Sequence, residues 1–302
     1  MSLPGTLVLL YHRVADLERD PHGLSVRPDR FAEQCEILRR RCDVVPLQEF
    51  KRPRRGVAIT FDDGYADNVG DALTILTAAR LPATFFVTVG RLGDRREVWW
   101  DRLERLLLGC QTGSGTIDVE VAGRRMWIDV RSTIARERAH QALFWRLRPM
   151  RPAAIQSTLD DIEAQLGVRT SDREAYRWMT VQELQSLASQ AGFAIGAHTI
   201  THPFLAELDE DEQWQEIEGS RHSLEQVLGR TVNLFSYPFG GREAFDTVTT
   251  ELVRRAGYTM ACTVAGGIAH ADSDPLRIPR NVVGDWDAER FEQWLDRWLT
   301  AA

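Results

Sequence analysis

Two short stretches of the 302-residue chain bring together side chains that bind metal ions. Asp62 and Asp63 are adjacent carboxylates at the end of one apolar run, and His198 and His202 are imidazoles four residues apart that follow another. Two histidines and one carboxylate form a hydrolytic metal site that leaves coordination positions free for water and substrate. The second carboxylate is then available as a general base for that water.

Each stretch also has a structural alternative. Asp63 and Gly64 form a common turn pair, so the carboxylates alone are compatible with a solvated turn. Pro203 disfavours a helical conformation at His202, so the two imidazoles are expected in a loop, where they could be purely structural. Two neighbouring carboxylates repel each other unless a cation or a proton intervenes, and the presence of both stretches in one chain therefore favours a metal site.

The segments Thr60–Tyr65 and His198–His202, TFDDGY and HTITH, resemble the TFDDG and H-[ST]-x-x-H motifs of the polysaccharide deacetylase superfamily (NodB homology, carbohydrate esterase family 4). The resemblance covers about residues 7–93 and 180–287. It implies Asp62 as the base and one divalent metal ion bound by Asp63, His198 and His202. Zinc is the expected ion, and this donor set also suits nickel, cobalt or iron.

A third segment, Phe235–Gly241, reads FSYPFGG and resembles the R-x-P-[YF]-G motif of the family, with Ser236 in place of the arginine. A similar Y-P-[YF]-G form is found in the branch that acts on exopolysaccharide and biofilm polymers. The resemblance implies that the backbone N–H of Phe239 stabilises the oxyanion and that Tyr237 and Pro238 bind substrate. The alternative is a plain turn after a strand.

The arginine that this third segment lacks is expected at Arg280, because deacetylases of the same branch carry a similar Pro-Arg pair near the C-terminus. A guanidinium can hold a carboxylate through two parallel hydrogen bonds and keeps its charge, so Arg280 is predicted to hold Asp62. The alternative is an ordinary surface arginine. Trp286 loosely resembles the D-W motif of the family and is the remaining candidate for substrate binding.

The general acid is the largest departure from the family. The usual L-x-H-[DS] motif near the C-terminus is absent, and the sequence around His270 does not match it. Tyr11-His12 instead resembles the Y-H element of the exopolysaccharide branch, in which the acid lies on the first strand. A histidine at a strand end can protonate a leaving amine, so we predict His12 as the acid, with His270 as the alternative.

Strands and helices alternate along the chain, which predicts parallel strands in an open sheet or a barrel. The family resemblance implies an α/β fold, a distorted (β/α)7 barrel, whose active site lies at the C-terminal ends of the strands. The expected strands lie at 7–11, 57–61, 83–89 and 193–197, and later at 234–237 and 258–264. The expected helices begin at Pro28 or cover 67–80, 209–228 and 288–299, and a capping box at Thr180 begins another.

The rhythm breaks between about residues 95 and 177, where the chain is rich in arginine. Helical patterning at 99–108 and 132–147 and a short β-like piece at 117–121 predict a mostly helical insertion within a single domain of residues 1–302. Its role is either packing or that of a lid or substrate platform, since long loops at an active-site face are often functional.

Composition excludes several classes of protein. The net charge of −7 argues against a nucleic-acid binder, and no apolar run approaches the ~18 residues of a membrane span. The start of the chain lacks the features of a signal peptide, and the four cysteines show no C-x-x-C spacing, which predicts reduced thiols in a cytoplasmic protein. No pattern indicates an oligomeric state.

These observations predict a metal-dependent hydrolase that removes an N-acyl group, N-acetyl in the first instance, from an amino sugar or glycan. Three alternatives stay open. One is a deacylase for a small-molecule or nucleotide-linked amide, such as a deformylase. Another is a catalytically impaired carbohydrate-binding homologue, which Ser236 motivates. The third is a non-heme iron oxygenase, which also uses two histidines and a carboxylate.

Overall fold

The computed structural model describes residues 5–51, 55–109, 115–168 and 171–300. The chain forms two compact units. The first, which we call the barrel unit, combines Met1–Gly93 with Trp178–Ala302, and the second, the inserted unit, is Asp94–Arg177. The inserted unit covers the stretch in which the sequence rhythm breaks, and its role as a lid or substrate platform stays a prediction.

The barrel unit is built on a curled eight-stranded sheet with the order β10-β9-β8-β5-β4-β1-β11, in which β12 also pairs with β1. All neighbouring strands are parallel except β11, which runs antiparallel to β1. This confirms the predicted α/β fold of the distorted NodB type. The strands are β1 (Gly5–Tyr11), β4 (Gly56–Phe61), β5 (Ala83–Val87), β8 (Phe193–Ala197), β9 (Leu234–Ser236), β10 (Met260–Cys262), β11 (Ile268–His270) and β12 (Asn281–Val282).

The segment from Pro275 to Val282 links the two edges of this sheet. Its first part bonds to β10, where Ala261 N–H donates to the carbonyl of Pro275 and Ile278 N–H donates to that of Ala261. Its last part is β12, which pairs with β1. We call it the closing segment, because it brings residues far along the chain to the strand ends of β1 and β4.

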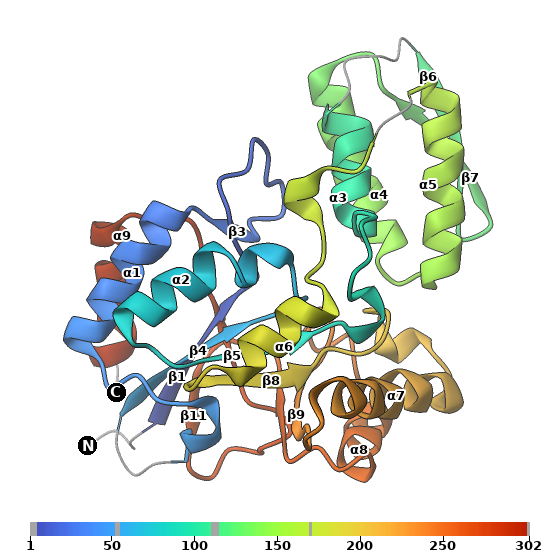
Figure 1. The fold of residues 1–302 in the computed structure, drawn as a ribbon. Coiled ribbons are helices and arrows are strands. Elements are labelled where there is room, and N and C mark those ends of the chain that lie inside the picture. The colour runs from blue at the N-terminus through green and yellow to red at the C-terminus, as the bar shows by residue number, and fades with distance from the viewer. Residues whose placement is uncertain (1–4, 52–54, 110–114, 169–170, 301–302) are drawn as a thin grey trace. The chain divides into compact units, whose positions relative to one another are not determined.

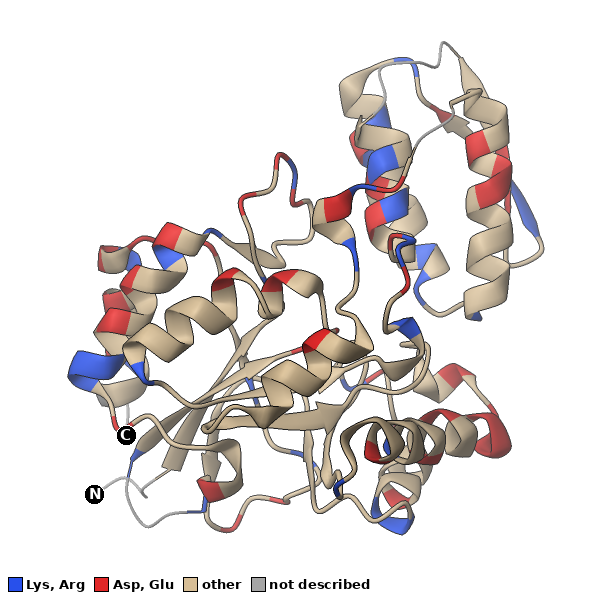
Figure 2. Cartoon of the chain, viewed as in Figure 1, with Lys and Arg blue, Asp and Glu red and all other residues tan. Residues whose placement is uncertain are grey.

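Helices cover the outside of the sheet (Figure 1). They are α1 (Pro28–Arg41), α2 (Asp71–Ala79), α6 (Val181–Ser189), α7 (Glu210–Leu228), α8 (Thr247–Arg255) and α9 (Ala288–Thr300). The predicted capping box is present, because Thr180 and Glu183 satisfy each other's backbone N–H groups at the start of α6. Charged residues lie on these helices and on loops, whereas the strands of this sheet carry almost none (Figure 2).

Successive residues of the strands pack into two separate clusters, because side chains alternate between the faces of a strand. Leu7, Leu9, Ile59 and Phe85 belong to the outer cluster beneath the helices. The cluster inside the barrel takes one or two residues from each of several strands, including Val8, Ala58, Phe86, Leu234, Cys262 and Ile278. At Gly196 in β8 an added Cβ would lie 2.5 Å from the Phe86 ring, so glycine makes room for that ring. The strands therefore have a packed floor beneath their C-terminal ends.

The inserted unit is a small helical body with one hairpin. Its elements are α3 (Trp99–Glu104) continued by a π-helical turn (Arg105–Gly109), β6 (Thr116–Val121), β7 (Arg124–Asp129), α4 (Thr133–Leu147) and α5 (Pro152–Leu166). Sequence periodicity indicated the first helix, β6 and α4, but it missed β7 and α5. The buried side chains of α4 and α5 include Leu143, Leu147, Ile155, Leu159 and Ile162.

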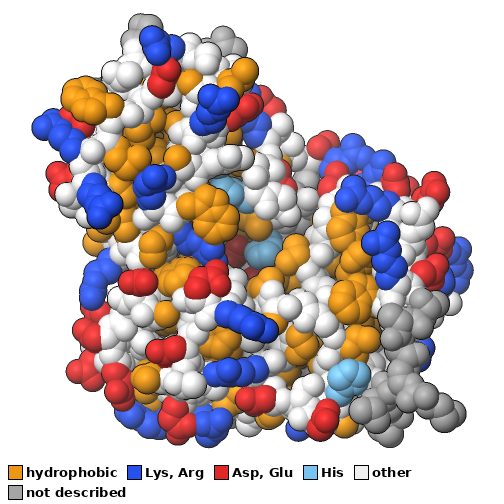
Figure 3. Space-filling model, turned by 180° about the vertical axis from the view of Figure 1, so that it is seen from behind, with side chains coloured by type: hydrophobic (Ala, Val, Ile, Leu, Met, Phe, Trp, Pro, Cys, Tyr) orange, Lys and Arg blue, Asp and Glu red, His pale blue; other side chains and the backbone are white. Residues whose placement is uncertain are grey.

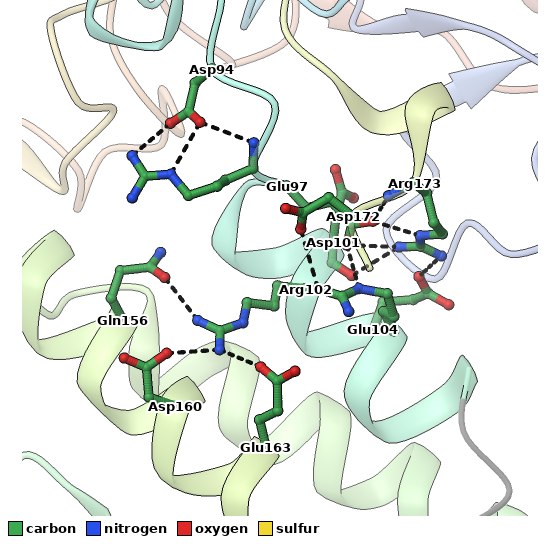
Figure 4. A network of polar contacts seen from close by, with 12 residues as sticks. Asp94, Glu97, Asp101, Arg102, Glu104, Gln156, Asp160, Glu163, Asp172 and Arg173 are labelled. Atoms are coloured by element: carbon green, nitrogen blue, oxygen red, sulfur yellow. Dashed lines mark hydrogen bonds and ion pairs between the residues drawn. The ribbon is translucent and has the colours of Figure 1, made fainter. Parts of the chain in front are cut away.

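A buried ionic network joins the beginning and the end of the inserted unit (Figure 4). One oxygen of Glu97 accepts hydrogen bonds from the backbone N–H and the Nε of Arg173, at 2.8 and 2.9 Å, and the other accepts from Nε of Arg105 at 2.8 Å. Arg173 also pairs with Glu104 at 2.7 Å. Because the Glu97 side chain is fully buried, these contacts are weakly screened and fix the ends of the unit to each other.

Among the described residues, no helix is both long enough and apolar enough to cross a membrane. Figure 3 shows charged side chains of both signs spread between hydrophobic ones over one face of the molecule. Cys35, Cys42 and Cys262 are unbridged thiols, and Cys110 lies outside the described residues.

Candidate active site

The polar residues singled out in the sequence follow the C-terminal ends of neighbouring strands. Asp62 and Asp63 follow β4, His198 follows β8, and Ser236 ends β9. The pairings of β4 with β5, β5 with β8 and β8 with β9 align these ends along the same edge of the sheet. This is the edge at which parallel barrels carry their active sites.

Asp63, His198 and His202 form a compact cluster of three potential ligand atoms. Oδ1 of Asp63 lies 3.5 Å from Nε2 of His198 and 3.4 Å from Nε2 of His202. The three ligand atoms lie within 4.8 Å of one another. Ligand atoms held about 2.1 Å from a tetrahedral ion would be about 3.4 Å apart, so this donor set fits one divalent cation.

Hydrogen bonds orient the His198 ring and hold the loop that carries both imidazoles. Nδ1 of His198 lies 2.7 Å from the backbone oxygen of Ser236, an acceptor, which makes Nδ1 the donor and leaves Nε2 as the free ligand atom. Thr199 Oγ1 donates to the His198 carbonyl at 2.6 Å and accepts the His202 N–H at 3.0 Å. Through these two bonds Thr199 holds the backbone of both histidines.

Glu216 on α7 holds the same loop from outside. Its carboxylate accepts the backbone N–H groups of Ile200 and Thr201, at 2.8 and 2.9 Å, and the hydroxyl of Thr201 at 2.6 Å. No sequence signal marked Glu216, because it lies within the helix α7, eighteen residues after His198. Its contacts make the imidazole loop part of the rigid outer layer.

Backbone strain gathers at this site. Six non-glycine residues in the described part of the chain have positive φ, and four of them are Asp63 (72°), Thr199 (64°), His202 (62°) and Phe239 (61°). Such conformations cost about 1–3 kcal/mol each and persist only where surrounding contacts enforce them. Strain of this kind gathers at functional sites in proteins, so its concentration at the strand ends agrees with the candidate site.

Asp62 is held by Arg280. Nη1 of Arg280 lies 2.7 Å from one Asp62 oxygen and Nη2 lies 2.6 Å from the other, and the arginine is fully buried. Burial by itself would raise the pKa of Asp62, but the charges of Arg280 and His198 outweigh it and hold that pKa well below its usual range. Asp62 is therefore ionised, and the predicted contact with Arg280 is present.

Ser236 explains how an arginine from a different part of the chain reaches this carboxylate. Its Oγ donates to Asp62 at 3.0 Å and accepts from Nη2 of Arg280 at 2.7 Å. Arg280 comes from the closing segment, and Thr60 and the carbonyl of Thr263 bind its other N–H groups at 3.3 and 3.2 Å. The small side chain at position 236 leaves the space that the guanidinium fills.

The two candidate acids lie at opposite ends of β1. Asp62 N–H donates to the carbonyl of Tyr11 at 3.1 Å, so the half-buried His12 follows directly beside the carboxylate pair. His270 pairs with Gly5 at the start of the strand. The seven residues of β1 span roughly 20 Å, so the structure brings His12 to the strand ends and leaves His270 at the other end of the sheet.

Two of the predicted substrate-binding residues, Tyr237 and Pro238, are buried. The Tyr237 side chain is fully buried, its hydroxyl donates to the carbonyl of Leu276 at 3.0 Å, and its ring stacks on Phe245 at 3.9 Å. Pro238 is buried as well. These contacts account for the Tyr237 side chain as packing, and the role of the two residues in substrate binding stays a prediction.

The other two candidates differ from each other. Phe239 is half-buried and its ring meets that of His202 edge-on at 4.7 Å, so its side chain lies beside the cluster, and the oxyanion role of its backbone N–H stays a prediction. Trp286 instead packs on Trp294 of α9 at 5.3 Å, with the Arg290 guanidinium over its ring. Its backbone oxygen accepts a bond from Gln34 of α1. These contacts account for Trp286 as packing, and its substrate role stays a prediction.

A family model for polysaccharide deacetylases matches residues 50–143 and 150–261, about two thirds of the chain. The chain belongs to the polysaccharide deacetylase family. It is accordingly a hydrolase of amide bonds in polysaccharides. The matched ranges include the carboxylate pair, both imidazoles and Ser236 but neither the candidate acid His12 nor Arg280.

Several solved structures share the fold of this polysaccharide deacetylase at low identity. The deacetylase PplD of Streptococcus pyogenes is 17% identical with a TM-score of 0.61, and the alignment covers 97% of this chain and 98% of that one. IcaB from Ammonifex degensii is 17% identical with a TM-score of 0.59 and coverage of 98% and 97%. A de-N-acetylase from Aggregatibacter actinomycetemcomitans is 15% identical, with 0.58 and coverage of 94% and 95%. No curated protein matches the chain.

Proposed function

We propose that this polysaccharide deacetylase removes N-acetyl groups from amino-sugar units of a glycan. The observation that carries the proposal is the cluster of Asp63, His198 and His202 beside an ionised Asp62 that is held by Arg280. Family membership supports a glycan substrate. The similar structures include a de-N-acetylase and a deacetylase in complex with acetate, which favours acetyl as the acyl group.

Asp63, His198 and His202 would hold one divalent ion, zinc in the first instance. When bound there, such an ion acts as a Lewis acid on the acyl carbonyl and lowers the pKa of water. The imidazole nitrogens and the carboxylate oxygen suit zinc, cobalt, nickel and iron alike. Metal analysis of the purified protein, with the wild type beside a His202→Ala variant, decides which ion is held and whether these residues hold it.

The protein's own groups handle the protons and the negative charge. Asp62 takes the proton of the attacking water, and Arg280 fixes the direction of its oxygens. The backbone N–H of Phe239 donates to the oxygen that becomes negative as the C–O bond forms. His12 gives a proton to the nitrogen as the C–N bond breaks, so that acetate and an amine leave.

The paired guanidinium has two opposing consequences for Asp62. It keeps the carboxylate ionised and correctly aimed, which a base requires, but it also makes the carboxylate a weaker proton acceptor. Asp62 therefore suits a short-lived transfer in which the proton passes on to the products rather than resting on the carboxylate. Ser236 at the position of the family's arginine was the reason for expecting a catalytically impaired homologue. Arg280 supplies a guanidinium beside Ser236 and Asp62, which argues against that alternative.

Release of acetate is the direct test. Acetylated glucosamine oligomers, lipid-linked and nucleotide-linked acetylated amino sugars, and matching formyl compounds would be compared at equal acyl concentration. We expect acetate from the oligomers to be released fastest. Turnover confined to a formyl compound or to a nucleotide-linked sugar would contradict the proposal and favour the small-molecule alternative. The cytoplasmic location stays a prediction, which cell fractionation tests.

A further inference from the structure

The segment that carries His12 is held by two side chains to which the proposed chemistry gives no role. Asn68 donates from Nδ2 to the backbone oxygen of His12 at 2.9 Å. Asp67 accepts the backbone N–H of Val14 at 3.1 Å. Both residues lie in the short 3-10 turn Ala66–Asn68, a few residues after Asp62. The loop that carries the base therefore also holds the strand end that carries the acid.

A buried ion pair reinforces this contact. Nε of Arg13 lies 2.9 Å from Oδ2 of Asp67, and the side chains are 1% and 10% exposed. The Arg13 guanidinium lies over the ring of Tyr65, 4.2 Å from its centroid. The backbone N–H of Arg13 donates to the carbonyl of Leu24, so the segment is held on its other side as well. Residues on both sides of His12 are thus fixed.

Asn68 has a feature that stability alone does not explain. The residue is fully buried and uses Nδ2 twice, toward the His12 carbonyl and toward Oδ1 of Asp67 at 3.1 Å. Its own Oδ1 has no hydrogen-bond partner among the described atoms. A buried oxygen without a partner destabilises the folded protein, so an amide is retained here at a loss. What the amide provides in return is a donor aimed at the His12 backbone.

We propose that Asp67 and Asn68 are positioning residues that set the place of the His12 ring for protonation of the leaving amine. The inference rests on the role of His12 in the proposed function. A misplacement of about 1 Å can cost about 10²-fold in rate. Asn68→Ala should accordingly lower kcat on an acetylated amino sugar by about 10–100-fold, with KM and metal content little changed.

The test compares two leaving groups on the metal-loaded enzyme. An acetylated glucosamine oligomer needs a proton on its leaving nitrogen, whereas the phenolate of 4-nitrophenyl acetate leaves without one. Asn68→Ala should therefore lose amide turnover and keep the ester rate within about threefold. Asp67→Asn serves as a second variant. Gln213→Ala is the matched control. Gln213 lies in α7, away from the turn that carries Asn68, and is also a buried amide that donates to a backbone carbonyl, that of Leu208.

A double-variant cycle separates positioning from a general loss of structure. If Asn68 acts through His12, adding Asn68→Ala to His12→Ala should lower amide turnover by less than about threefold further. An equal loss on ester and amide, or losses that multiply in the double variant, would overturn the positioning role while leaving the deacetylase proposal standing. A wild-type enzyme that cleaves the ester but no acetylated amino sugar would overturn both.

Discussion

The pairing of Asp62 with an arginine from the closing segment can be tested by moving the guanidinium back to β9. Asp62 is 3% exposed in the wild type, and Arg280→Ser removes both guanidinium contacts from its carboxylate while the Ser236 hydroxyl stays bound to it. Removing one partner of a buried ion pair costs about 3–5 kcal/mol, because the other charge stays buried without compensation. Ser236→Arg alone should also destabilise, since it forces a second guanidinium into the space that Arg280 fills.

The double variant Ser236→Arg/Arg280→Ser restores one guanidinium and one hydroxyl around Asp62, with their origins exchanged. We expect a coupling free energy of at least about 2 kcal/mol in favour of the double variant, because the two positions share one partner. Urea unfolding with a chelator present measures this without the stabilisation that a bound metal adds. Acetate release with metal present then reports whether the relocated arginine still aims Asp62.

Two results would refute this reasoning. An Arg280→Ser variant that unfolds within about 1 kcal/mol of the wild type and keeps its turnover would show that the guanidinium does not hold Asp62. Purely additive losses in the double variant would show that position 236 cannot present a guanidinium to this carboxylate. A control at an exposed ion pair, Arg39→Ser beside Glu36, should leave the urea midpoint almost unchanged.

The remaining predictions concern the metal cluster, the proton-transferring side chains and a buried histidine of the inserted unit. His198→Ala should lose most of its metal affinity, and a stoichiometric ion retained at low micromolar metal would contradict the ligand assignment. Asp62→Asn and His12→Ala should each keep the metal and lose about 10²–10⁴ in rate. His270→Ala should keep its turnover. Acetate release and metal analysis check these three variants. Burial lowers the pKa of His140 to about 4, so unfolding takes up a proton between about pH 6.5 and 4. The melting temperature should fall across that range by the equivalent of roughly 2 kcal/mol, and less in His140→Leu.

The sequence predicted those parts of the molecule that local patterns encode. The strands before Asp62 and His198, the capping box at Thr180 and the alternation of strands with helices are all readable within a few residues. Together they predict parallel strands in an open sheet or a barrel, and the family resemblance implied the barrel. The resemblance also indicated Arg280 as the partner of Asp62. Local patterns do not show whether a side chain is buried, since an aromatic residue after a strand can face either substrate or core. Tyr237 faces the core, and only its contact with Leu276 reveals this.

The residues that sequence reasoning missed share a physical reason. Glu216 and Asn68 act through hydrogen bonds to backbone groups of segments that are 16 and 56 residues away in the chain. Such contacts depend on the register of the sheet and the placement of a helix against it, and they leave no periodicity or spacing in the sequence. A side chain that binds backbone also needs no particular residue type at its target.

The guanidinium that pairs with Asp62 comes from Arg280 in the closing segment, whereas the R-x-P-[YF]-G motif would place it at position 236. The ends of β1, β4 and β9 and the closing segment converge on Asp62, so a guanidinium needs only to reach that point, whichever segment carries it. The same convergence applies to the acid, because His12 at the end of β1 lies directly beside the carboxylate pair. Both groups lie outside the range that the family model covers, yet both are fixed to the loop of Asp62 by hydrogen bonds. The chemistry therefore depends on which side chains lie together at the strand ends. A variant in which the same side chains come from different segments should preserve the reaction.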